Sequence, residues 1–464
     1  MKLYNTLTRQ ADELKPINPP IISVYTCGPT VYDYSHIGHW FTFVRWDTLI
    51  RVLKASGYQP KWVMNITDVG HLVSDADDGE DKLEKGARRE GKTAWEVAAF
   101  YTDDFVQGMR ALNMLPPDEM PKATDHIAEQ IDLITKLENL GFTYVISDGV
   151  YYDTSKFPQY ADFAKLDLEE QQAGARVEPN PEKRNPTDFA LWKFSPKGQQ
   201  RDMEWDSPWG KGFPGWHIEC SAMSMKYLGD TLDIHTGGID HIPVHHTNEI
   251  AQSQPITGKP FANIWLHSNH VLINDEKISK SLGNGIRWQQ LAEKGFDPIV
   301  LRLHVLESHY RSQSKFSWES LEAAKNRLKS YERMADLQFQ PVENDVWFAG
   351  DQTIHAMLET MQDDLNTPKA LALLSALAGR AEEQLISTAE IEFFRQVMHG
   401  IDELLGLNLA DRSDITDTQK ALIIDRETAR ETKDWPKSDS LRDELVKQGI
   451  GLRDTEHGPI WYRM

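Results

Sequence analysis

The sequence predicts an α/β protein in which a parallel sheet forms the N-terminal two thirds and a helical region follows. A β-branched run, IISVYT at residues 21–26, enters the loop CGPTVYDYSHIGH, and a helical pattern then leads to a second run, KWVMNIT, at residues 61–67. This order of strand, loop, helix and strand is typical of a parallel βαβ unit, whose ligands lie at the carboxyl ends of the strands. Past about residue 318, a 3.6-residue period replaces the strand signals.

The helix of this unit is predicted to begin at Gly38 and to end before Gly57. Apolar residues recur there every three or four positions: Phe43, Trp46, Ile50 and Leu53. Residues 174–215 are rich in Pro, Gly and Trp, which predicts an irregular stretch. Long helices are predicted over 320–337 and 368–385, and a shorter one over 437–449 with a possible hairpin arm at 457–464.

The composition indicates a globular protein of several domains. The 464 residues allow about three domains, and 40% hydrophobic with 26% charged residues is ordinary for a globular chain. There are only two cysteines, Cys27 and Cys220, so a disulfide scaffold is excluded. No apolar run approaches the ~20 residues that would span a bilayer, so no membrane span is expected. The polar N-terminus shows no secretory signal, which predicts a cytoplasmic protein. The net charge of −21 disfavours a nucleic-acid partner without excluding one, because binding needs only a local basic face.

Two short motifs suggest phosphate chemistry. In the first, His36, Gly38 and His39 stand where the loop meets the helix, whose N-terminus attracts phosphate. In the second, Lys277 and Lys280 lie three apart in KISKSLGN after the strand-like HVLIN, so both cations can close over a triphosphate. Taken singly, the first motif is more typical of surface helix caps and the second of an exposed polar loop. Their order, each after a presumed parallel strand, favours a joint nucleotide site.

The two motifs resemble HIGH and KMSKS, the signatures of the class I aminoacyl-tRNA synthetases, with Ile278 in place of Met. Within that class, the chain resembles the cysteinyl-tRNA synthetase family nearly end to end. The matching segments, in order, are CGPTVYDYSHIGH, NPTDFALWK, PGWHIECSAMS, HHTNEIAQS, KISKSLGN and KDWPKSDSLRDEL.

This resemblance implies a domain plan. Residues 1–317 would form a Rossmann-like catalytic domain with a connective segment inserted at about 110–215. Residues 318–405 would form a helical bundle that contacts tRNA, and 406–464 a small anticodon-binding module. The implied activity is a cysteine–tRNA ligase with ATP, L-cysteine and tRNA(Cys) as partners and Mg²⁺ with the ATP. The chain is expected to act as a monomer.

The resemblance also implies a zinc site. Its ligands would be Cys27, Cys220, His245 and Glu249, a donor set that suits Zn²⁺. Glu249 lies four residues after His245, so on a helix both face one side. A zinc ion could take the substrate thiol as an added ligand, whereas the hydroxyl of serine would coordinate weakly. Seen alone, the HHTNE segment is more typical of an ordinary polar cluster, and a single cysteine more typical of a buried thiol.

Further roles are implied by position in the family pattern. His36, His39, Lys277 and Lys280 would be catalytic and, together with Gly38, would bind ATP. Other residues would contact substrates: Gly238 and Asp240 the ribose, His235 the adenylate region, Thr67, Trp216 and His217 the cysteine, and Arg430, Asp439 and Asp454 the anticodon. The alternative for Trp216 is ordinary packing in a Pro/Gly loop.

The chain departs from the common pattern beside the proposed ligands. The departures are Gly70 and His71 after TDV, Thr236, the extra imidazole His241, and Thr247. None replaces a proposed ligand, so they affect the surroundings that tune zinc affinity and pocket shape. Two rival functions remain: a ligase that joins cysteine to an amino sugar and shares the catalytic half, and a non-catalytic zinc-containing tRNA-binding protein. Intact HIGH and KISKS segments disfavour the second rival.

Overall fold

We analysed a computed structural model of the chain. It describes residues 1–70, 82–166, 180–196, 198, 201–273, 276–277, 285–343 and 350–464. The chain forms two compact units. The first comprises Met1–Pro298, Ser308–Phe316 and Gln362–Leu365, and the second comprises Ile299–Glu307, Ser317–Met361 and Asn366–Met464. Among the described residues, no helix combines the length and apolar character needed to cross a membrane.

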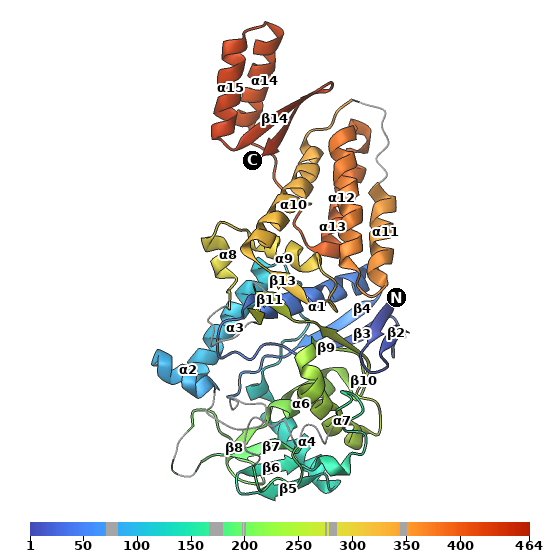
Figure 1. Ribbon diagram of the computed structural model, residues 1–464, viewed down its shortest axis with the longest axis vertical. Helices are drawn as coiled ribbons and strands as arrows, with labels where there is room; N and C mark the ends of the chain where they lie inside the picture. The colour runs from blue at the N-terminus through green and yellow to red at the C-terminus, as the bar shows by residue number, and fades with distance from the viewer. Residues whose placement is uncertain are drawn as a thin grey trace. The chain divides into compact units, whose positions relative to one another are not determined.

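A four-stranded parallel sheet organises the first unit (Figure 1). Its order is β10–β9–β3–β4, with bounds Ala262–Ser268, Leu232–Gly238, Ile21–Thr26 and Gln59–Met64. Helix α1 (Ile37–Ala55) connects β3 to β4 and ends before Gly57, whose φ of 84° suits glycine. This confirms the predicted parallel βαβ unit, although β4 begins and ends a few residues earlier than the second predicted run.

Between β4 and β9 the chain forms an inserted antiparallel sheet of order β5–β6–β7–β8. Its strands are Thr143–Ile146, Gly149–Tyr152, Phe189–Phe194 and Gly212–Pro214. The stretch predicted to be irregular therefore contains two strands, β7 and β8. Strand β7 forms because the apolar run FALWKF lies between the prolines. The remaining elements of this region are α2 (Lys82–Glu90), α3 (Ala94–Ala111), η1 (Ala123–His126), α4 (Ile127–Asn139), η2 (Thr154–Lys156) and α6 (Trp216–Leu228).

Smaller elements complete the first unit. These are β1 (Lys2–Asn5) and β2 (Gln10–Glu13), η3 (Ile239–His241), η4 (Ile242–His246), α7 (Thr247–Thr257), α8 (Gln289–Glu293), and the sheet of β11 (Val271–Ile273), β12 (Glu276–Lys277) and β13 (Ser314–Phe316). Helix α9 (Pro298–Leu306) belongs almost wholly to the second unit. One hydrophobic core of the first unit lies among the parallel sheet, α4, α6, α7 and the inserted sheet, and includes Cys27 and Cys220.

The second unit is helical. Its helices are α10 (Trp318–Asp336), η6 (Leu337–Phe339), α11 (Gly350–Gln362), α12 (Thr367–Gln384), η7 (Thr388–Glu390), α13 (Ile391–Leu405), α14 (Asp417–Glu431) and α15 (Trp435–Lys447). Capping boxes begin α10 at Ser317 and α14 at Thr416. The chain ends in the hairpin of β14 (Ile450–Thr455) and β15 (Gly458–Arg463), which confirms the predicted C-terminal arm.

Candidate functional site

The candidate site lies at the carboxyl ends of β3 and β9. The chain leaves β3 for β4 on one side of the sheet, and leaves β9 for β10 on the other side. Such a reversal opens a crevice between the two central strands, where ligands of parallel sheets bind. Cys27 follows β3 directly, and η3 and η4 follow β9.

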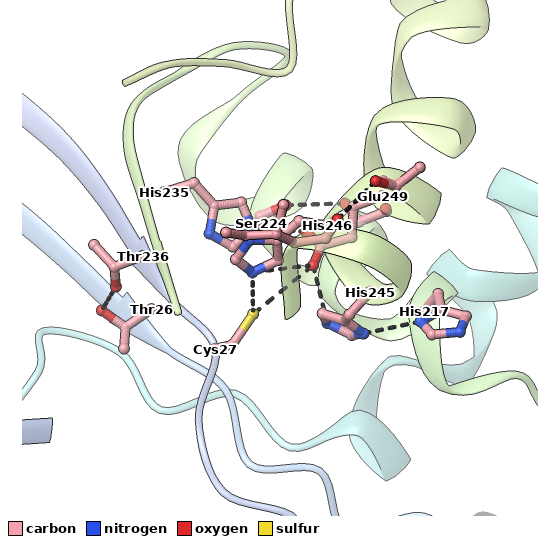
Figure 2. Close-up of polar contacts among 12 residues, drawn as sticks. Thr26, Cys27, His217, Ser224, His235, Thr236, His245, His246 and Glu249 are labelled. Atoms are coloured by element: carbon pink, nitrogen blue, oxygen red, sulfur yellow. Dashed lines mark hydrogen bonds and ion pairs between the residues drawn. The ribbon is translucent and has the colours of Figure 1, made fainter. Parts of the chain in front are cut away.

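Four side chains with metal-binding atoms meet near this end of the sheet. Cys27 comes from the end of β3, Cys220 from α6, and the last two from η4 and α7: His245 and Glu249. Their ligand atoms all lie within 4.8 Å of one another, and all four residues are buried. His245 Nε2 lies 2.9 Å from Glu249 Oε1, and Cys27 Sγ lies 3.8 Å from the same oxygen (Figure 2). The structure thus brings together the four residues predicted as zinc ligands.

Burial makes the charges of this group interdependent. Burial alone would raise the pKa of Glu249, but the neighbouring imidazoles of His235 and His245 hold it well below its usual range. Burial would likewise lower the pKa of His245, yet the charges of Glu249 and Cys220 raise it to about 10. A buried group of thiols and a carboxylate is costly without a compensating cation.

The donor set fits a zinc ion. Two sulfurs, one imidazole nitrogen and one carboxylate oxygen are ligands that Zn²⁺ accepts, and a buried cation would neutralise the negative charge gathered there. His245 Nδ1 lies 2.9 Å from His217 Nδ1, on the side away from Glu249. When His245 donates Nδ1–H to His217, its Nε2 lone pair faces the other three ligands. A ligating histidine is commonly oriented by such a contact.

The HIGH segment forms the N-terminus of α1. His36 caps the helix by accepting a hydrogen bond from Gly38 N–H at Nδ1 (3.1 Å), and His39 Nδ1 accepts from His36 N–H (3.2 Å). The two rings stack with centroids 3.8 Å apart. Because both Nδ1 atoms accept, each neutral ring carries its hydrogen on Nε2 and can donate from that atom. Capping and phosphate binding are therefore compatible roles for these histidines.

The KISKS segment lies mostly outside the described residues. Lys277 is described at its backbone in β12, whereas Lys280 is not among the described residues. The segment that follows returns to the HIGH motif: Ile37 N–H donates to Ile286 O at 2.8 Å, and His36 pairs with Arg287 as a β-bridge. Residues 286 and 287, a few positions after the KISKS motif in the sequence, thus contact the start of α1.

Two of the three residues predicted to contact cysteine, Trp216 and His217, lie beside His245. Trp216 begins α6, and its ring centroid is 4.6 Å from that of His245. The Thr67 hydroxyl accepts from Asn65 Nδ2 (3.0 Å) and donates to Glu219 Oε2 (3.1 Å), so its proton is already engaged. His217 Nδ1 faces His245 Nδ1, so His217 contacts a proposed zinc ligand in addition to its predicted role in the cysteine pocket.

The predicted ribose residues follow β9. A Cβ on Gly238 would lie 2.3 Å from Asp240 Oδ1, so this carboxylate can fold over the backbone only at a glycine. Asp240 is exposed. His235, in contrast, is fully buried and lies 2.6 Å from Glu249 Oε2 through Nε2, which places it beside the ligand group.

Two of the departures form local hydrogen bonds. The Thr236 hydroxyl donates to Thr26 Oγ1 (2.9 Å), which joins β9 to β3 just before Cys27, and the Thr247 hydroxyl donates to Ile242 O (2.7 Å) across η4. His241 packs over Gly237. The structure describes Gly70, whereas His71 lies outside the described residues.

The three residues predicted to read an anticodon lie in the second unit. Arg430 on α14 contacts Asp454 on β14, with Nη1 and Oδ2 3.1 Å apart. Asp454 also accepts hydrogen bonds from Arg426 at 2.8 and 3.1 Å. Asp439 on α15 is largely exposed, and its Oδ1 lies 3.3 Å from Arg442 Nη1 on the same helix. The structure therefore brings Arg430 and Asp454 together.

Sequence reasoning missed part of the histidine cluster. His246 Nε2 lies 3.3 Å from Cys27 Sγ, and its Nδ1 lies 2.8 Å from His267 Nε2. The only sequence signal for His246 is its place three residues before Glu249 in HHTNE. His267 lies on β10 and reaches the cluster only through the parallel pairing of β10 with β9.

Comparisons with known proteins show which family the chain resembles. Residues 13–326 match the tRNA synthetases class I (C) catalytic domain, 356–410 the DALR domain, and 412–463 the cysteinyl-tRNA ligase anticodon binding domain. The chain is 45% identical to cysteine–tRNA ligase 1 of Burkholderia lata, with 100% of this chain and 97% of that protein covered. It is 42% identical to the cysteine–tRNA ligase of Treponema denticola, with both chains covered fully.

A solved structure supports the fold. Mycobacterium tuberculosis methionyl-tRNA synthetase in complex with methionyl-adenylate superposes with a TM-score of 0.59 at 15% identity, covering 84% of this chain and 92% of that one. The three family matches follow one another along the chain in the expected order, and the relatives match it over its full length, so the resemblance drawn from the sequence is confirmed. The chain belongs to the cysteine–tRNA ligase family of the class I aminoacyl-tRNA synthetases.

Proposed function

We propose that this chain activates L-cysteine with ATP, forms cysteinyl-adenylate and diphosphate, and transfers the cysteinyl group to the 3′ end of tRNA(Cys). The observation that carries the proposal is the buried group of Cys27, Cys220, His245 and Glu249 near the carboxyl end of the sheet. Two of the three residues proposed to line a cysteine pocket, Trp216 and His217, lie beside His245. The family relationship supports the same reaction.

In the first step, the cysteine carboxylate attacks the α-phosphorus in line and diphosphate leaves. His36 and His39 would donate from Nε2–H to phosphate oxygens at the helix N-terminus, where negative charge is favoured. Lys277 and Lys280 would stabilise the departing diphosphate, with Mg²⁺ bound to ATP. Gly238 and Asp240 would hold the ribose. The residues therefore act by positioning and by charge stabilisation.

Cysteine selection would depend on the four ligands. These four residues would hold a zinc ion, which would offer a ligand position suited to the thiolate of cysteine and poorly suited to the hydroxyl of serine. His217 would keep the His245 ring in the tautomer that leaves Nε2 for the metal. Trp216 would pack beside the substrate. A pocket that selects by size alone separates such close analogues by roughly 10–200-fold. Recognition of the thiol by a metal would therefore remove the need for an editing domain.

In the second step, a hydroxyl of the terminal tRNA ribose attacks the activated carbonyl and AMP leaves. Arg430, Asp439 and Asp454 would contact the anticodon.

We also propose the boundaries 1–317, 318–405 and 406–464 for the catalytic domain, helical bundle and anticodon-binding module. The enzyme would act as a monomer in the cytoplasm, where reducing conditions keep Cys27 and Cys220 available as free thiols.

The test is ATP–pyrophosphate exchange with each amino acid, followed by charging of tRNA transcripts. We expect exchange with cysteine alone and charging of tRNA(Cys) alone. Exchange with another amino acid and not with cysteine would refute the proposal. Exchange with cysteine but transfer only to an amino sugar would support the rival ligase, which the match of residues 412–463 to an anticodon-binding domain disfavours.

Metal analysis tests cysteine selection separately. The purified protein should hold about one zinc per chain. Removal of that zinc with a chelator should abolish the preference for cysteine over serine and should be reversed by added Zn²⁺. A metal-free protein that still excludes serine would show that the four ligands do not provide the selectivity.

A further inference from the structure

Two sets of four ligand-type side chains overlap in the core of the first unit. The first is Cys27, Cys220, His245 and Glu249, and the second is Cys27, His235, His246 and Glu249. Within each set, the ligand atoms all lie within 4.8 Å of one another, and every member is buried. We propose that the second set is an alternative metal site, which shares Cys27 and Glu249 with the first and accepts Zn²⁺ or a similar ion such as Co²⁺.

Glu249 faces both sets. Its Oε1 lies 2.9 Å from His245 Nε2, whereas its Oε2 lies 2.6 Å from His235 Nε2. One carboxylate oxygen is thus directed to a histidine of each set. The Glu249 side chain therefore does not need to change its rotamer to contribute a ligand to either site.

Cys27 is the second shared residue. Its Sγ lies 3.8 Å from Glu249 Oε1 and 3.3 Å from His246 Nε2, and that nitrogen lies 4.0 Å from the same carboxylate oxygen (Figure 2). These separations are close to the spacing between neighbouring ligands around one tetrahedral zinc ion, given bonds of about 2.0–2.3 Å. His235 completes the second set through Glu249.

The ring orientation of His246 matches that of a ligand. Its Nδ1 lies 2.8 Å from His267 Nε2, and His267 Nδ1 lies 2.7 Å from the Thr6 hydroxyl. When His246 donates Nδ1–H to His267 and His267 donates Nδ1–H to the Thr6 hydroxyl, this series of hydrogen bonds ends at Thr6. The Nε2 lone pair of His246 then faces Cys27. His217 orients His245 in the same way in the first set. Each set therefore contains a histidine whose far nitrogen is held by another histidine.

The two sets face different surroundings. The first lies beside Trp216, whose ring is 4.6 Å from His245. The second packs against Trp265, which stacks on His235 at 4.7 Å and lies 5.1 Å from His246. An ion in the second site would thus neutralise Cys27 and Glu249 in the core without facing the cysteine pocket. Because both sites need these two residues, and two dications so close repel strongly, one ion occupies the pair at a time.

The experiment counts Co²⁺ after removal of zinc from the full-length protein. In Cys220→Ala/His245→Ala, the first set keeps only two ligands while the second stays intact. In His235→Ala/His246→Ala, the first set stays intact. Adding His246→Ala to the first double variant weakens both sets. Bound cobalt is measured per chain, and the thiolate-to-cobalt absorption band reports how many sulfurs bind the ion.

We expect about one Co²⁺ per chain in the wild type and in both double variants. The triple variant, in which the second set keeps only three ligands, should bind Co²⁺ more weakly than the Cys220→Ala/His245→Ala protein. The absorption band per ion should fall to about half in Cys220→Ala/His245→Ala, because one thiolate replaces two. A folded Cys220→Ala/His245→Ala protein without cobalt would overturn the proposal, as would a triple variant that binds as well as the double. Two ions per wild-type chain would overturn alternative occupancy.

If the alanine variant fails to fold, Cys220→Ser/His245→Gln provides the same comparison with side chains closer in size. The cobalt count does not depend on enzyme activity. Wild-type protein that shows no cysteine-dependent exchange would refute the proposed function and leave the two-site comparison intact. Conversely, exchange with cysteine together with a cobalt-free Cys220→Ser/His245→Gln protein would refute the second site alone.

Discussion

Arg45 Nη2 donates a hydrogen bond to Ser314 Oγ at 2.6 Å, in the interior of the first unit. The same guanidinium donates through Nη1 to Ser268 Oγ at 2.7 Å and through Nη2 to Ser308 Oγ at 3.0 Å. Burial lowers the pKa of Arg45 to about 9, so the group stays charged at neutral pH. Its position links α1, which begins at the HIGH segment, to β13.

Strand β13 pairs with β11, and β11 pairs with β12, which contains Lys277. Arg45 therefore connects the helix of the first motif to the sheet that leads into the second. We expect Arg45→Lys, which keeps the charge and loses the planar fork, to lower kcat of pyrophosphate exchange about tenfold, or about 1.4 kcal/mol in the barrier. The KM for cysteine should change less than twofold, because the proposed cysteine pocket lies elsewhere.

Arg51 provides the matched control for this prediction. It is also buried on α1, but it pairs with Asp47 (2.9 Å) and donates to Asn113 O (2.7 Å), away from β13. Arg51→Lys should lower the melting temperature without a selective loss of kcat. Equal kinetic effects of the two substitutions would show that Arg45 contributes only to stability.

Lys280→Ala should impair adenylate formation far more than cysteine binding. The lysine is proposed to act on charge that develops at the phosphates, so its loss should lower exchange by about 10²-fold or more. Calorimetric binding of cysteine to the zinc-loaded protein should stay within about twofold. Lys54→Ala, at the last turn of α1, serves as the control lysine. Unchanged exchange in folded Lys280→Ala protein would contradict the assigned role.

The sequence allowed the local elements to be predicted. The period of Phe43, Trp46, Ile50 and Leu53 and the stop at Gly57 locate α1 within a residue or two, because helix period and end signals are local. The four ligand residues came from family motifs and not from spacing, since Cys27 and Glu249 are more than 200 positions apart.

The surrounding contacts could not be predicted in the same way. The contact between Thr6 and His267 spans 261 positions, and that between Arg45 and Ser314 spans 269. Each depends on how strands and helices pack, which a pattern within one segment does not report. The strand FALWKF, in contrast, has a local signal. It was missed because prolines and glycines on both sides obscured this short apolar run.

The Arg426–Asp454 pair predicts a pH dependence in the C-terminal hairpin. Hydrogen bonds from Arg426 hold the pKa of Asp454 below its usual range. A carboxylate with a lowered folded-state pKa stabilises the fold above its unfolded pKa of about 4, and this stabilisation is lost as the pH falls through the folded value. Arg426→Gln should therefore raise the pKa of Asp454 toward its usual range, as measured by carbon-13 NMR of the carboxyl.

The difference in melting temperature between wild type and Arg426→Gln should accordingly be larger at pH 6 than under strongly acidic conditions. Arg442→Gln is the control, because Arg442 pairs with the exposed Asp439 and not with Asp454. An Asp454 pKa that stays low in Arg426→Gln would assign the shift to Arg430 alone.

Removal of the C-terminal module should separate amino-acid activation from tRNA charging. The cut belongs after Ala410, because Arg302 donates to Leu405 O at 2.6 Å in the buried core of the helical region. Truncation there removes Arg412 and Arg463, which pair with the buried carboxylate of Asp336 at 2.7 and 2.5 Å. An unpaired buried charge costs several kcal/mol, so Asp336→Asn should accompany the truncation.

Residues 1–410 with Asp336→Asn should retain cysteine-dependent pyrophosphate exchange within about twofold, because every proposed ATP and metal residue precedes residue 285. Charging of tRNA(Cys) should fall by about 10²-fold or more, since the anticodon contacts that position the acceptor end are gone. Full-length Asp336→Asn controls for the substitution. Added salt should weaken tRNA binding by the full chain despite the charge of −21, because only the contacting basic surface releases counterions. A folded truncated protein that charges tRNA as well as the full chain would show that residues 411–464 do not read the anticodon.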